Sequence, residues 1–222
     1  MLNRQVLESK LLQKLLAHPE LNLTILSDEE LLASIRTTLE QNPTKELWIF
    51  AYGSLIWNPL FDYLERRVVT LNAWQRRFCL LAPVGRGTID NPGLVLGLEQ
   101  GNFCQGIAYR LAVDDNLEAE LLLLWRREMV VGSYIPTWLA ANDGKQDIPV
   151  LAFTVNPYHP VYVNNLSTEK LVCSLATAKG FLGSSAEYLS STVQGLLAEG
   201  IEDPELIELD RLVKHRQKTL II

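Results

Sequence analysis

The first 45 residues carry apolar positions at helical spacing. Four leucines recur three or four residues apart and predict a first helix. They are Leu7, Leu11, Leu12 and Leu15. A second helix is predicted from Ser27, which forms a capping box with Glu30 and precedes an apolar run that Asn42-Pro43 stops. Residues 1–45 are therefore expected to form a helical N-terminal extension that covers the main domain or makes a dimer contact.

From Leu47 the pattern changes to short apolar segments separated by Gly, Pro, Asn and Asp, which is typical of strands. These segments follow one another without regular helical crossovers, so a mostly antiparallel sheet or barrel is expected rather than a doubly wound fold. The candidate strands are Trp48–Tyr52, Val68–Trp74, Phe78–Leu81, Leu94–Leu98, Ile107–Leu111, Tyr134–Leu139 and Val150–Val155.

One predicted helix, Asn116–Met129, interrupts the strands, and two or three more close the chain. The candidates span about 168–179, about 186–199 and the residues after Asp203-Pro204. Residues 46–222 are thus expected to form one α+β domain, a small mixed and mostly antiparallel β-barrel with flanking helices.

Composition narrows the functional classes. With 48% hydrophobic and 21% charged residues, the 222-residue chain can bury a core, and its net charge of −6 without a dense basic run argues against nucleic-acid binding. Arg66-Arg67 and Arg76-Arg77 are interpreted as solvated strand edges. The three cysteines are far apart in the sequence, so no disulfide framework is expected. No apolar segment is long enough to span a bilayer, so no membrane partner is expected. We expect a cytoplasmic protein.

The first candidate site is the turn after the strand that ends near Tyr52. Gly53 lets the backbone approach a ligand closely, and successive amides here can form a nest for a carboxylate. Asn58-Pro59 is interpreted as an N-cap and first helical turn. Ser54 lacks the second glycine of a nucleophile elbow. On the residues alone, a plain strand-to-turn junction is the favoured interpretation.

The second candidate is Glu128, which continues an apolar helix face. It falls seven residues after Leu121, with Asp115 and Glu118 as expected capping residues and Gly132 after the end. Burial and the negative end of the helix would both raise the pKa of this carboxyl toward the range useful for proton transfer. An exposed glutamate paired with Arg126 or Arg127 fits the pattern equally well.

Other candidates are weaker. His18, His159 and His215 are isolated, so no metal-ligand spacing occurs and each is interpreted as a surface or packing residue. The segment 85–88 lacks the ending of a P-loop and is interpreted as a hairpin or flexible loop.

Six motifs in order resemble the ChaC family of γ-glutamyl cyclotransferases. They include an aromatic-x-Arg-Arg-Phe strand, an Arg-Gly-Thr…Pro-Gly loop and an Arg-Glu-x(3)-Gly-x-Tyr segment. The matching residues are Phe50–Pro59, Trp74–Phe78, Arg86–Thr88 with Pro92-Gly93, Gly106–Leu111, Arg127–Tyr134 and Ala178–Leu189.

The resemblance implies an activity and a site. In this family the α-amine of a γ-glutamyl group attacks its own γ-carbonyl and releases 5-oxoproline, and the usual substrate is glutathione, with cysteinylglycine as the leaving amine. It implies Glu128 as the catalytic acid–base and no metal or organic cofactor. It places the substrate's head group at Tyr52, Gly53, Ser54 and Leu55, with Tyr188 lining the pocket.

Departures from the family pattern leave the substrate open. Gly85 stands where a histidine is frequent, and Ser133 replaces a second glycine. Another γ-glutamyl amine or peptide is therefore an alternative substrate. A non-catalytic binding protein on the same fold and a serine hydrolase using Ser54 are further alternatives. The oligomeric state is not predicted.

Overall fold

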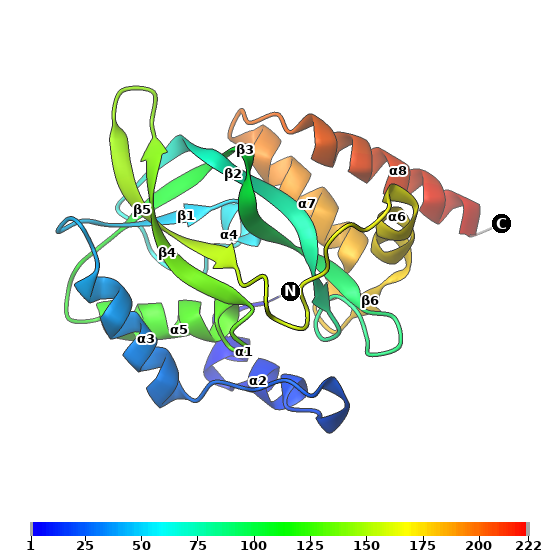
Figure 1. The fold of residues 1–222 in the computed structure, drawn as a ribbon, viewed down its shortest axis with the longest axis horizontal. Coiled ribbons are helices and arrows are strands. Elements are labelled where there is room, and N and C mark those ends of the chain that lie inside the picture. The colour runs from blue at the N-terminus through cyan, green and yellow to red at the C-terminus, as the bar shows by residue number, and fades with distance from the viewer. Residues whose placement is uncertain (1, 221–222) are drawn as a thin grey trace.

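The computed structural model describes residues 2–220, and its centre is a closed five-stranded barrel (Figure 1). Neighbouring strands follow the order β1-β3-β2-β4-β5, and β3 also meets β5 to close the ring. Most pairings are antiparallel, while β5 pairs in parallel with β1 and β3. The strands are β1 Leu47–Ala51, β2 Glu65–Ala82, β3 Gly93–Leu111, β4 Tyr134–Asn142 and β5 Asp147–Val155. This confirms the predicted α+β barrel.

Strands β2 and β3 are longer than predicted, since each joins two of the expected strands. They form one antiparallel hairpin of 18 and 19 residues. A bulge at Ala73, whose φ is +64°, shifts the register of β2, and residues 100–103 of β3 are exposed. Pairing resumes on both sides of the bulge, at Asn72–Phe103 and Trp74–Gln100, although the hydrophobic alternation that marks a strand is lost.

The predicted helices around the barrel are present. Helix α5 connects β3 to β4, while α6, α7 and α8 pack together on one side of the barrel (Figure 1). The expected cap of α5 was wrong, because its N-cap is Asn116 and Glu118 instead pairs with Arg36 at 3.0 Å. The elements are α4 Ser54–Trp57, α5 Leu117–Glu128, α6 Thr168–Thr177, β6 Lys179–Gly180, β7 Gly183–Ser184, α7 Ser185–Ala198 and α8 Pro204–Leu220.

The N-terminal extension covers the barrel domain. Its first predicted helix is broken at Lys10, whose φ is +55°, but the Ser27–Glu30 capping box is present. Leu31 and Ile35 on α3 are fully buried, and each such side chain contributes about 2 kcal/mol on burial. The elements are α1 Arg4–Glu8, α2 Leu11–Leu16, a 3₁₀ turn Pro19–Leu21 and α3 Asp28–Glu40.

Two indole donors fasten this extension to the domain. Trp125 Nε1 on α5 donates to Ser34 Oγ at 3.0 Å, and Trp138 Nε1 on β4 donates to the Thr38 carbonyl at 2.9 Å. Both tryptophans thereby satisfy their polar atoms while their rings pack against the core. Among the described helices, none is both long and apolar enough to cross a membrane.

Candidate active site

The turn between β1 and α4 forms the floor of the candidate site. Strand β1 is buried along its whole length, and α4 begins at Ser54 directly after Gly53. The φ of Gly53 is −139°, so the residue is needed for space: a Cβ here would lie 3.0 Å from the Tyr188 hydroxyl. The expected helix start at Asn58-Pro59 was wrong, because Asn58 is the C-cap of α4.

Arg76 fixes the position of this turn. Its Nη1 donates to the Tyr52 carbonyl at 2.8 Å, and its Nε lies 3.1 Å from Asp203 Oδ2. Only 4% of its side chain is exposed, so the interpretation of Arg76 as part of a solvated strand edge was wrong. A charged donor was needed because the strand pairing leaves this carbonyl inside the domain.

Glu128 is the last residue of α5 and points into the domain. Its side chain is 14% exposed, which excludes the alternative of an exposed helix-end glutamate. Burial raises the pKa of the Glu128 carboxyl, and the Arg127 guanidinium, 2.9 Å away, opposes that rise. The Glu128 carboxyl therefore stays protonated to a higher pH than a solvated carboxyl does.

Arg127 connects the two candidate segments. Its Nε contacts Glu128 Oε1, its Nη2 donates to Ser54 Oγ at 2.9 Å, and its Nη1 donates to the Asn58 carbonyl at 2.6 Å. One guanidinium therefore orients the glutamate at the end of α5 against the turn that follows β1. From the sequence, Arg127 was predicted as a pairing partner and as part of a family motif, but not as a site residue.

Three tyrosines surround the carboxylate. Tyr52 donates to the Phe153 carbonyl at 2.8 Å, and Tyr134 donates to the Leu96 carbonyl at 2.7 Å. Burial, together with the nearby charge of Glu128, raises the pKa of Tyr52, Tyr134 and Tyr188. All three remain protonated phenols at neutral pH. Tyr134 was not predicted as a site residue, although it ends the Arg-Glu-x(3)-Gly-x-Tyr motif.

All six predicted site residues line one small cavity of about 20 Å³. It has room for little more than one water molecule, so a larger ligand must also use adjoining space or move side chains. A second cavity of about 180 Å³ adjoins it and shares Ser54, Glu128, Tyr134 and Tyr188. The lining of the smaller cavity is Tyr52, Gly53, Ser54, Leu55, Leu96, Glu128, Tyr134, Phe153 and Tyr188.

Residues 47–216 match the family described as ChaC-like protein, and they contain the whole of the smaller cavity. The chain belongs to the ChaC-like family. It is 41% identical over 186 residues to a protein of Escherichia coli named glutathione-specific gamma-glutamylcyclotransferase, covering 82% of this chain and 80% of that protein. A Danio rerio protein named glutathione-specific gamma-glutamylcyclotransferase 1 is 30% identical, over 74% of this chain and 87% of its own.

A solved structure shares the fold of this ChaC-like chain. The structure of a yeast glutathione-specific γ-glutamyl cyclotransferase superposes with a TM-score of 0.70 at 20% identity. The match covers 78% of this chain and 97% of the yeast chain. The closed barrel with its flanking helices is therefore the cyclotransferase fold.

The family's Arg-Gly-Thr loop joins β2 to β3 and supports Tyr188. Arg86 Nη1 donates to the Leu182 carbonyl at 3.0 Å, and its guanidinium lies 5.4 Å from the Tyr188 ring centre. Helix α7, which carries Tyr188, begins with a capping box between Ser184 and Glu187. The interpretation of this segment as a hairpin connection is confirmed, and the loop contacts the start of α7.

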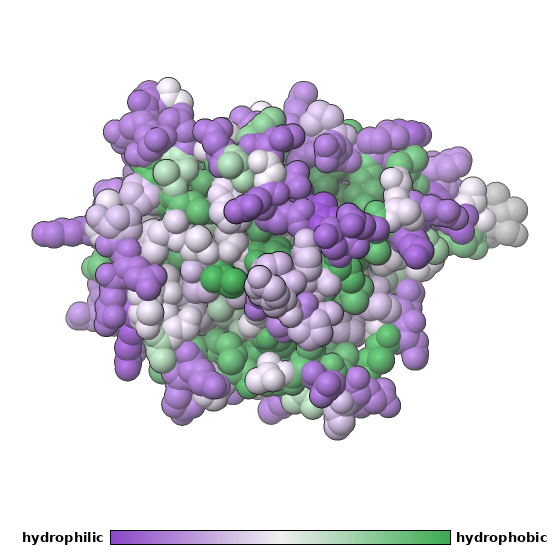
Figure 2. All heavy atoms as spheres, viewed as in Figure 1, coloured by the Kyte–Doolittle hydropathy of each residue, from purple (hydrophilic) through white to green (hydrophobic). Residues whose placement is uncertain are grey.

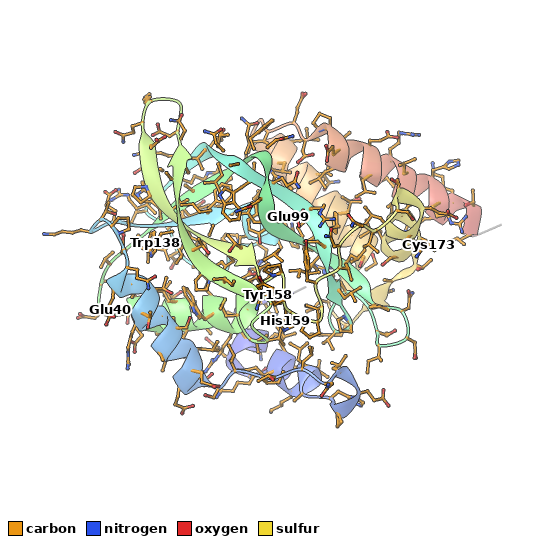
Figure 3. The ribbon with its side chains drawn as sticks, in the orientation of Figure 1. Glu40, Glu99, Trp138, Tyr158, His159 and Cys173 are labelled. Carbon is orange, nitrogen blue, oxygen red and sulfur yellow. The ribbon has the colours of Figure 1, made fainter. Side chains whose placement is uncertain are left out.

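The histidines have no place in this ChaC-like site. His159, labelled in Figure 3, lies in the loop after β5, where its Nε2 contacts the Val131 carbonyl at 2.8 Å and its Nδ1 accepts from the Val161 amide. It is a packing residue, as predicted. Within residues 2–220, no histidine lines either cavity, and Ser54 Oγ is held by a guanidinium instead of a base. Ser54 is therefore not activated as a nucleophile.

Proposed function

We propose that this chain is a γ-glutamyl cyclotransferase that converts glutathione to 5-oxoproline and cysteinylglycine. The observation that carries the proposal is the meeting of a buried carboxylate, Glu128, with the Tyr52–Leu55 turn in one cavity. The names of the relatives from Escherichia coli and Danio rerio support the same reaction class and substrate.

The proposed reaction is intramolecular. The α-amine of the γ-glutamyl group attacks its own γ-carbonyl carbon, so that a C–N bond forms within the ring and the bond to the leaving amine breaks. The attacking nitrogen loses a proton and the leaving nitrogen gains one, so no water is consumed. Because nucleophile and electrophile belong to one molecule, orientation supplies much of the acceleration, and no metal or organic cofactor is required.

Glu128 is proposed to move that proton. A carboxylate whose pKa is raised by burial is a stronger base than a solvated one, and after accepting the proton it can donate it to the leaving amine. The neighbouring Arg127 keeps the ionised form accessible, since its guanidinium lies 2.9 Å from Oε1. No second acid or base is needed for this sequence of transfers.

The turn after β1 is proposed to bind the amino-acid head group. Ser54 and Leu55 begin helix α4, so their amides have no carbonyl earlier in that helix to bond and can donate to the α-carboxylate. The Ser54 hydroxyl adds a further polar contact, and Tyr188 also lines the cavity. The substrate's flexible chain would then be folded so that its amine faces its γ-carbonyl.

The test is direct. Purified protein is incubated with glutathione, and 5-oxoproline and cysteinylglycine are measured by mass spectrometry. Equal amounts of the two products are expected, with none formed in the absence of protein. Production of glutamate instead of 5-oxoproline would indicate hydrolysis and contradict the proposal. The cytoplasmic location belongs to the same proposal and is checked by fractionating the cells that produce the protein.

A further inference from the structure

The larger cavity is an apolar compartment that opens directly beside Glu128. It has a volume of about 180 Å³ and shares Ser54, Glu128, Tyr134 and Tyr188 with the smaller cavity. Away from these shared residues its wall is mostly aliphatic. Representative members are Leu12, Leu16, Leu23, Val95, Val131 and Leu182.

The N-terminal extension supplies one wall of this apolar compartment. Leu12 and Leu16 lie on α2 and Leu23 follows the 3₁₀ turn, all outside the 47–216 family match. The wall is held in place near the catalytic glutamate, because the Leu26 amide donates to the Val130 carbonyl at 2.9 Å. Figure 2 shows hydrophobic side chains gathered along the lower part of this face, where α1 and α2 lie in Figure 1.

A second contact fixes the start of the extension to the family's own motif. Asn58 Nδ2 donates to the Leu2 carbonyl at 2.9 Å, while the carbonyl of Asn58 accepts from Arg127. Arg126 also donates to Asp28 from Nε at 3.1 Å and from Nη2 at 2.8 Å. The extension is thus joined to the residues on either side of Glu128.

Polar side chains are a minority in the lining of the apolar compartment, and Asn58 and Ser133 are among them. Its charged lining residues are Arg86, Arg127 and Glu128, and Arg127 is already engaged by Ser54 and the Asn58 carbonyl. Arg86 donates to the Leu182 carbonyl and stacks near Tyr188. The thiol, amide and carboxylate of cysteinylglycine would therefore find little to bond across most of this wall, whereas a hydrocarbon chain would match it.

Resting on the proposed function, we infer that the apolar compartment receives an aliphatic chain carried by the leaving amine. The substrate class is then γ-glutamyl peptides with such a chain, and S-alkyl glutathiones are its simplest members. The bonds that form and break are those of the glutathione reaction. The thioether is untouched, and the products are 5-oxoproline and S-alkyl cysteinylglycine.

The experiment compares glutathione, S-methylglutathione and S-hexylglutathione by 5-oxoproline release. Since each buried methylene favours binding several-fold, kcat/KM for the hexyl compound should exceed that for the methyl compound by at least roughly tenfold, mainly through a lower KM. Leu12→Glu should reduce the hexyl-to-methyl ratio of kcat/KM. The matched control is Leu11→Glu, because Leu11 is on the same helix, is 38% exposed and does not line the compartment.

The outcomes separate this inference from the function on which it rests. Turnover of glutathione with equal or lower kcat/KM for S-hexylglutathione than for S-methylglutathione overturns the inference and leaves the cyclotransferase function standing. An unchanged ratio in Leu12→Glu overturns the role of the N-terminal wall. Absence of 5-oxoproline from all three compounds overturns both the function and the inference.

Discussion

Arg127 and Glu128 are adjacent in the chain, and their side chains meet at the cavity, with Nε of the arginine 2.9 Å from Oε1 of the glutamate. The same guanidinium donates to Ser54 Oγ, so the proposed acid–base and the proposed head-group turn share one charged partner. Burial and Arg127 act on the glutamate in opposite directions, and burial is the larger effect. The pH dependence of activity should report this balance.

Replacing Arg127 by glutamine should move the acid limb of the pH profile of kcat/KM to higher pH. In the proposed mechanism Glu128 acts as a base when ionised, so activity should rise as pH increases through the pKa of its carboxyl. Loss of the guanidinium removes the influence that lowers this pKa. At a pH on that limb, kcat/KM should fall by roughly tenfold or more.

The control for this variant is Arg126→Gln. Arg126 is the preceding residue and pairs with Asp28, so its loss removes one positive charge nearby without removing the partner of Glu128. The acid limb of the kcat/KM profile of Arg126→Gln should lie at the same pH as that of the wild type. An unshifted limb in Arg127→Gln, or a shift to lower pH, would show that Arg127 does not tune Glu128.

Gly53→Ala should impair the site through Tyr188. The added Cβ would lie 3.0 Å from the tyrosine oxygen and 3.6 Å from Leu96 Cδ1, so the ring must move by a few tenths of an ångström. We expect a loss in kcat/KM of roughly tenfold and a loss in unfolding free energy of about 1–3 kcal/mol.

A double variant separates this contact from a general backbone effect. Tyr188→Phe removes the oxygen that the new methyl group meets, so Gly53→Ala should cost less activity in that background than in the wild type. Steady-state kinetics of the four proteins measures the difference. The same loss in both backgrounds would mean that the methyl group acts elsewhere.

Ser54→Ala should weaken binding more than it slows the chemical step. The hydroxyl contacts Arg127 and faces the cavity but has no histidine to activate it, so its removal costs polar contacts with the substrate. KM should rise by roughly tenfold while kcat changes little. Abolished turnover, together with a covalent adduct on Ser54 in the wild-type protein by mass spectrometry, would favour the hydrolase alternative instead.

Much of the fold follows from hydrophobic periodicity, and its failures have local causes. The longer helices, α3 and α5 to α8, were predicted because most have an apolar stripe and a recognisable start or end, as at Gly132 and at the Ser27 capping box. Strand β3 was divided because residues such as Gln100 and Phe103 are exposed while their backbone stays paired with β2, on either side of the bulge. Pairing across a hairpin is not encoded in the alternation of one strand.

The site was only partly predictable, because its key contacts join residues distant in sequence. The sequence pattern indicated that Arg76 is at a solvated strand edge, yet its side chain is buried and donates to the Tyr52 carbonyl. Tyr134 looked like a strand residue, yet it reaches Leu96 beside the carboxylate. Likewise, the helix face placed Glu128 among apolar residues, but only the resemblance to a family gave the glutamate a role. Its catalytic role stays a prediction.

The most direct test of that role is the rate of 5-oxoproline formation from glutathione by Glu128→Gln. Glutamine keeps the size of the side chain and a hydrogen-bonding group for Arg127 but cannot accept the substrate's proton. With circular dichroism and thermal unfolding showing a folded protein, kcat should fall by roughly 10³-fold or more. A folded Glu128→Gln protein with the wild-type rate would contradict the account.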